Sequence, residues 1–184
     1  MQPYFAKMEE SAQNIIIPVK GMTKGEHSFS YAIDGKFFQI FGNSQIKDAG
    51  CSVNADVVRH STLLSVVCRV GGFVVVECDR CLDDLVLKVD VERELTVGLG
   101  SVDIDDSTDE EDVLVINEND GEVDISQFVY DYICLSLPIM KVHPEGKCNP
   151  EMIARLVSNA GSEEPVEDSR TPFSGLKDML DDKL

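Results

Sequence analysis

Two cysteines separated by two residues are the residues of this sequence best suited to do chemistry. Cys78 and Cys81 belong to a Cys-Asp-Arg-Cys run, and in a tight turn this spacing lets both sulfurs bind one metal ion. Zinc in proteins takes four ligands in a tetrahedron, mostly thiolate sulfur and imidazole nitrogen. His143 and Cys148 offer a second pair at H-x4-C spacing. The sequence therefore predicts a candidate zinc site at Cys78, Cys81, His143 and Cys148 that joins a sheet to a C-terminal lobe.

Three other interpretations of the thiols stay open at this point. In the first, Cys78 and Cys81 are small, half-buried side chains of a hairpin. In the second, they form a redox pair of the thioredoxin type, although such a pair usually lies where a strand enters a helix and the flanks here are strand-like. In the third, a cysteine nucleophile pairs with His143, which has no evident third partner.

The remaining motifs do not indicate an enzyme. Gly98-x-Gly100 is followed by acidic residues rather than by a lysine and a helix, so it does not predict a phosphate-binding loop. The sequence has no G-x-S-x-G elbow, and no carboxylate pair stands out from the charged background. We therefore expect a non-enzymatic protein with no catalytic residues, no small-molecule substrate and no cofactor apart from the candidate zinc.

Apolar residues that alternate with polar ones predict a sheet over roughly the first 120 residues. Residues 51–97 are expected to form an antiparallel meander of about four strands, because each strand needs a neighbour for its backbone groups. Gly71-Gly72 is predicted to be a two-residue turn within it. Shorter strands are expected at 15–20 (an edge strand), 37–41 and 113–116, while 25–33 is either a strand or a loop.

A helix is predicted after the turn at 119–121. Asp124 is a favourable N-cap, and Pro138 ends the helical pattern. The apolar residues that recur at helical spacing between them are Ile125, Phe128, Tyr132 and Leu135.

The C-terminal third predicts further helical structure. Residues 150–159 are expected to form a short helix with Pro150 near its first position. Residues 161–184 are expected to be an acidic linker followed by a short amphipathic helix with an apolar stripe over 173–180. We predict the α+β class, with one domain over 1–160 built from a mainly antiparallel sheet or partly open barrel and two or three C-terminal helices.

The charge of −18 is unevenly placed. Residues 1–60 hold six of the 16 basic and six of the 34 acidic side chains. The other 10 basic and 28 acidic side chains lie in residues 61–184. An acidic loop is expected at 101–112. The negative charge of residues 61–184 repels a phosphate backbone and attracts basic proteins. A plain solubilising coat is the alternative interpretation.

The N-terminal sequence predicts a cytoplasmic protein. Residues 1–10 lack the apolar segment of a secretory signal, and no run of 18 apolar residues is present to span a membrane. In a reducing cytosol the six cysteines are expected to be thiols, metal ligands or redox groups rather than disulfides.

Three blocks in order resemble the bacterial YceD family, domain-of-unknown-function family 177. Residues 76–82 resemble its C-x-R-C-L signature, 124–138 its D-[IL]…L-x-L-P segment, and 143–148 its closing H-x-x…C segment. The resemblance covers about residues 50–150. The positions that match the family motifs are Cys78, Arg80, Cys81, Leu82, Pro138, His143 and Cys148.

The resemblance implies a role in accumulation of 23S ribosomal RNA and in assembly of the large ribosomal subunit, without a known mechanism. Combined with the charge, it favours contact with a basic ribosomal protein or an assembly intermediate, with ribosomal RNA contacted indirectly. The first alternative is direct RNA binding, for which Lys20, Lys24, Lys36 and Lys47 lie near Phe37, Phe38 and Phe41, although those rings are better explained as core. The second is a zinc-dependent or redox CxxC protein.

Overall fold

The computed structural model describes residues 13–100, 112–117 and 120–160, and its main feature is an open five-stranded sheet. The strand order is β2-β3-β4-β5-β6, with every pair antiparallel except β5 and β6. The strands are β2 (Gly25–Asp34), β3 (Ile46–Arg59), β4 (Leu63–Glu77), β5 (Asp84–Leu99) and β6 (Val113–Ile116). A two-stranded sheet pairs β1 (Ile16–Pro18) with β7 (Glu122–Asp124). The helices are α1 (Gly35–Ile40), α2 (Ser126–Ser136) and α3 (Pro150–Ala160).

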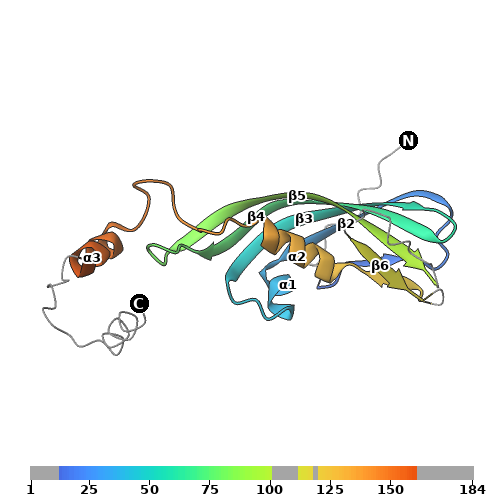
Figure 1. Cartoon of the computed structure of the whole chain (residues 1–184), viewed down its shortest axis with the longest axis horizontal. Helices are drawn as coiled ribbons and strands as arrows, with labels where there is room; N and C mark the ends of the chain where they lie inside the picture. The colour runs from blue at the N-terminus through green and yellow to red at the C-terminus, as the bar shows by residue number, and fades with distance from the viewer. Residues whose placement is uncertain (1–12, 101–111, 118–119, 161–184) are drawn as a thin grey trace, which may run out of the picture.

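The core lies on one face of the long sheet. Alternate residues of the strands are buried, as the period-two pattern predicts. The helix α2 packs against β4 and β5, and Val129 and Ile133 enter the core from its inner face. In Figure 1, α1 and α2 lie on the same side of the curved sheet. The predicted α+β class is therefore confirmed, with a sheet that remains open.

The predicted turn at Gly71-Gly72 is wrong, because both residues lie inside β4. Even-numbered positions from Leu64 to Val76 point to the core without interruption, so one strand replaces the two expected. The meander therefore has three long strands instead of four. Gly72 has φ +155°, and a Cβ there would lie 2.2 Å from the Gly50 carbonyl oxygen on β3. Glycine is needed here for the close approach of two strands rather than for chain reversal.

The aromatic strand predicted at 37–41 is also wrong, because this segment is the helix α1. The Asp34 carboxylate accepts the Lys36 backbone N–H at 2.8 Å and caps its N-terminus. Phe37 and Phe38 are adjacent and both fully buried, which a strand with one core face cannot achieve. The aromatic residues of this segment therefore lie on a short helix that packs against β2 and β3.

The other short elements agree with the sequence. The strands β1 and β6 and the helices α2 and α3 lie where they were expected, and 25–33 is a strand. Asp124 lies one residue before the N-cap Ile125, although its carboxylate still accepts the Ser126 N–H at 2.8 Å. The buried face of α2 is built on Val129 and Ile133, whereas Leu135 is exposed.

Several predictions concern segments beyond the described residues. These are the acidic loop up to residue 111, part of the turn at 119–121, and the linker and stripe of 161–184. Within the described part of the chain, no helix is long and apolar enough to cross a membrane.

Candidate metal centre

The turn between β4 and β5 holds the two cysteines of the CxxC pair. The Cys78 N–H donates to the Asp83 carbonyl and the Leu82 N–H to the Cys78 carbonyl, both at 2.9 Å. Leu82 adopts φ +64°, a conformation that L residues rarely take and that reverses the chain here. The turn leaves the side chains of Cys78 and Cys81 buried next to one another, while Leu82 is exposed.

A second segment, which follows α2, runs back to this turn. The Asp79 N–H donates to the Lys141 carbonyl at 2.7 Å, and the Lys141 N–H donates to the Asp79 carboxylate at 2.6 Å. This pair of bonds joins backbone positions that are far apart in the sequence. The residues that follow Lys141 bring His143 and Cys148 beside the CxxC turn.

The four predicted ligands come together. One donor atom each from Cys78, Cys81, His143 and Cys148 lies within 4.8 Å of all the others. A zinc ion with bonds of about 2.3 Å to sulfur and 2.0 Å to nitrogen holds such donors roughly 3.5–3.8 Å apart. A contraction of about 1 Å or less therefore converts this cluster into a tetrahedral site. Three sulfurs and one imidazole nitrogen are a donor set that zinc prefers.

The surroundings of the Cys78 sulfur favour its thiolate form. Its burial would raise its pKa, but backbone N–H groups of Cys81, Arg80 and His143 donate to the sulfur and lower the pKa to about 6. The thiolate is the form that binds metal. Burial raises the pKa of Cys148, and its hydrogen bonds with the other two thiols raise it further. Negative charge in the cluster therefore concentrates first on Cys78.

The two ring nitrogens of His143 have different partners. Nε2 lies 3.2 Å from the Asp84 carbonyl oxygen, which can only accept, so Nε2 carries the proton. Nδ1 lies 3.4 Å from the Cys81 sulfur and faces the cluster. A hydrogen bond with Cys78 is the main reason that the His143 pKa is raised. A histidine whose outer N–H is held by a carbonyl is the usual arrangement of a metal ligand.

The geometry argues against two of the interpretations of the thiols. The CxxC pair lies between two strands, so no helix N-terminus stabilises it as in a thioredoxin-type pair. His143 contacts two thiols at once and is bound to a carbonyl, which is unlike the nucleophile-base pair of a cysteine hydrolase. The interpretation of Cys78 and Cys81 as buried hairpin side chains stays open, because both are buried in the β4–β5 turn. Cys51 and Cys68 lie in the sheet core, away from the cluster. Burial raises the pKa of Cys68 to about 12, with a smaller contribution from Asp56.

The remaining motif positions surround this cluster or the end of α2. The side chain of Arg80 is exposed, and its backbone N–H is the group that contacts the Cys78 sulfur. Pro138 follows the last residues of α2 and lines a surface pocket. The roles of Asp79 and Asp84 were missed by sequence reasoning, because both depend on contacts with residues more than 50 positions away in the sequence.

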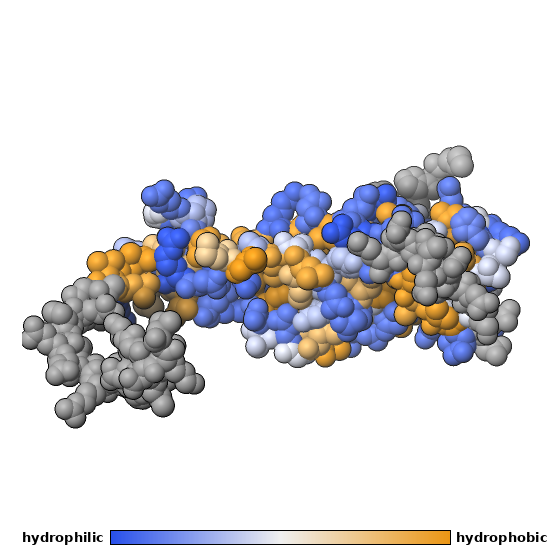
Figure 2. All heavy atoms as spheres, in the orientation of Figure 1, coloured by the Kyte–Doolittle hydropathy of each residue, from blue (hydrophilic) through white to orange (hydrophobic). Residues whose placement is uncertain are grey.

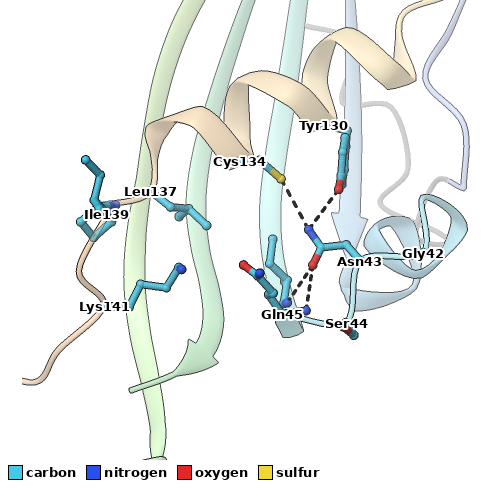
Figure 3. Close-up of a pocket in the computed structure, with 11 residues that line it drawn as sticks. Gly42, Asn43, Ser44, Gln45, Tyr130, Cys134, Leu137, Ile139 and Lys141 are labelled. Atoms are coloured by element: carbon cyan, nitrogen blue, oxygen red, sulfur yellow. Dashed lines mark hydrogen bonds between the residues drawn. The ribbon is translucent and has the colours of Figure 1, made fainter. Parts of the chain in front are cut away.

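The pocket beside Pro138 has a volume of about 510 Å³ and lies between the end of α1 and the end of α2. Figure 3 shows Asn43 at one side of it, below α2, where the side-chain amide donates to the Tyr130 hydroxyl at 3.1 Å and the Cys134 sulfur at 3.6 Å. The Asn43 side-chain oxygen Oδ1 accepts the Gln45 N–H at 2.8 Å. Asn43 therefore uses its polar groups to hold the α1–β3 turn and offers few of them to a ligand.

A comparison with protein families settles the family of the chain. The family model described as "Large ribosomal RNA subunit accumulation protein YceD" matches residues 66–180. The chain belongs to the YceD family. The match contains all four clustered residues and α3, and it continues past residue 150, where the resemblance was expected to end. No curated protein and no solved structure matches the chain. The family name links this YceD protein to accumulation of the large-subunit ribosomal RNA.

Proposed function

We propose that this YceD-family chain is a non-enzymatic accessory factor of large-subunit biogenesis, which supports 23S ribosomal RNA accumulation through contact with a basic ribosomal protein or an assembly intermediate. The observation that carries the proposal is the family match over residues 66–180. The charge supports a protein partner, because residues 61–184 contain 28 acidic and 10 basic side chains. Such a surface repels bare RNA and attracts cationic proteins.

The second part of the proposal is a structural zinc ion held by Cys78, Cys81, His143 and Cys148. The donor set, the Nε2 bond to Asp84 and the N–H groups directed at Cys78 support it. Catalytic zinc sites usually have three protein ligands and one open position, whereas structural sites have four protein ligands. Four protein donors in this cluster therefore favour a structural ion and a protein without enzymatic activity.

Direct RNA binding through the N-terminal half has less support. Phe37 and Phe38 are fully buried, so their rings are not available for stacking on bases. Lys47 pairs with Glu77 at 3.3 Å and with Asp84 at 2.7 Å, which neutralises one of the expected phosphate-binding residues.

Affinity capture of the tagged full chain from cells, with and without nuclease, tests the ribosomal role. We expect to recover large-subunit proteins or precursor particles with the tagged chain. We expect a protein partner to stay bound after nuclease treatment. Recovery of an unrelated metabolic complex would contradict the proposal, and so would a steeply salt-dependent affinity for protein-free 23S RNA. Elemental analysis tests the metal separately, with one zinc ion per chain expected.

A further inference from the structure

The helix α3 exposes an apolar face. Met152 and Ile153 are half-buried, whereas Leu156 and Val157 are 49% and 67% exposed. At 3.6 residues per turn these four side chains lie on one side of the helix. Ala154 and Ser158, the residues available for comparison, lie on the opposite side. Figure 2 shows apolar surface gathered over the position of α3.

Within the described residues, α3 is attached to the molecule mainly at its first turn. Cys148 belongs to the metal centre, the Asn149 carboxamide accepts the Glu151 N–H at 3.0 Å, and Met152 packs against the edge of the core. In Figure 1, α3 lies beyond the β4–β5 turn and not over the sheet. A helix of 11 residues is marginal in water without packing, so an uncovered apolar face is costly here.

The charge of the sequence that adjoins α3 indicates the kind of partner that fits its apolar face. The segment that follows α3 in the sequence, 161–184, holds seven acidic and three basic residues, and the whole chain carries −18. On α3 itself, Glu151 and Arg155 offset one another. An apolar strip next to acidic sequence fits an apolar groove with a basic rim. It does not fit RNA, which would require a cationic strip.

We propose that α3 is the docking helix of this protein and that it inserts Leu156 and Val157, with the adjoining Ile153, into an apolar groove of a basic large-subunit protein. This inference rests on the proposed ribosomal function and names the element that makes the contact. Cys148 of the Cys/His cluster lies two residues before α3, and the helix extends from there with Leu156 and Val157 exposed.

The test compares two double variants of the full, zinc-loaded chain. Leu156→Asp/Val157→Asp places two charges on the apolar face, and Ala154→Asp/Ser158→Asp places the same charges on the opposite face. Both changes are at exposed sites, and circular dichroism and zinc content check that each variant folds. The probes are salt-washed large-subunit precursor particles from cells that lack the chain, and the purified basic proteins of the large subunit, each tested alone.

We expect wild type and the Ala154→Asp/Ser158→Asp control to bind equally, and Leu156→Asp/Val157→Asp to bind on the order of tenfold more weakly or worse. Equal binding by all three proteins would overturn the docking role of α3 and leave the ribosomal function intact. A wild type that binds none of the probes would overturn the ribosomal function itself. A self-associated wild type that Leu156→Asp/Val157→Asp converts to monomers would identify a second copy as the occupant, and would also overturn the proposal.

Discussion

The sheet body, residues 25–99, and the C-terminal arm, residues 139–160, are held in place by different forces. The sheet body has long backbone ladders and a continuous apolar core. The arm leaves Ile139 98% exposed and Met140 73% exposed, and it is joined to the sheet by the Asp79–Lys141 hydrogen bonds and the Cys/His cluster. The comparison teaches that the sheet body is held by a large buried core, whereas the arm is held by a few local contacts, so bound zinc as proposed above would affect the arm far more than the sheet body.

The largest effect on the sheet body is expected from Gly72→Ala. A Cβ at this position meets the Gly50 oxygen at 2.2 Å and the Cys51 Cα at 2.6 Å, and both are backbone atoms of β3. We expect a loss of about 4 kcal/mol or more in the free energy of unfolding, measured by denaturant titration. The adjacent Gly71→Ala is the control, because nothing lies within 4 Å of its added Cβ. Similar losses for the two variants would contradict a close strand approach at Gly72.

Cys81→Ser is expected to affect the arm and to leave the sheet body unchanged. Removal of one buried ligand should reduce zinc from one ion per chain to nearly none, while the far-ultraviolet dichroism of the sheet stays the same. Cys134→Ser is the control, because this thiol lies near Asn43 and outside the cluster. Full zinc content in Cys81→Ser would exclude Cys81 as a ligand.

Thiol labelling should separate the two regions within one molecule. After chelation we expect Cys78, Cys81 and Cys148 to react with an alkylating reagent, because release of the arm uncovers Cys78 and Cys81 and separates Cys148 from them. Cys51 and Cys68 should react only after unfolding, since both are buried and the pKa of Cys68 is raised to about 12. Peptide mass analysis identifies the modified residues. Early modification of Cys68 would show that the sheet body also depends on metal.

The smallest effect is expected from Asp34→Ala at the cap of α1. Loss of the hydrogen bond to the Lys36 N–H should cost about 1 kcal/mol of stability, with no change in zinc content. Glu26→Ala, on the exposed part of β2, is the control in the same denaturant titration. A change in zinc content in Asp34→Ala would link regions that the comparison treats as separate.

The sequence predicted those parts of the fold that depend on local periodicity. Alternation identified β3 and β5, helical spacing identified α2, and Pro150 marked the start of α3. It failed at Gly71-Gly72, because two glycines permit a turn and a close strand approach equally well. It failed at α1, because adjacent buried aromatics such as Phe37 and Phe38 resemble a strand until the N-cap is considered.

The sequence indicated the candidate ligands of the site but not the residues that orient them. The spacing of Cys78, Cys81, His143 and Cys148 suggested a shared site as one of several interpretations, and the structure brings their donor atoms together. The proton position on His143 depends on the Asp84 carbonyl, and the path of the arm depends on Asp79 and Lys141. These contacts join segments that are far apart in sequence, so no local pattern contains them.

The most direct test measures backbone hydrogen exchange in the zinc-loaded and the chelated protein. The account predicts that amides of 141–153 exchange at least about tenfold faster without zinc, while those of β3, β4 and β5 keep their protection. Equal exchange of the arm in both forms would contradict a role for metal in fixing it. Loss of protection across the whole sheet would contradict a sheet body that is stable by itself.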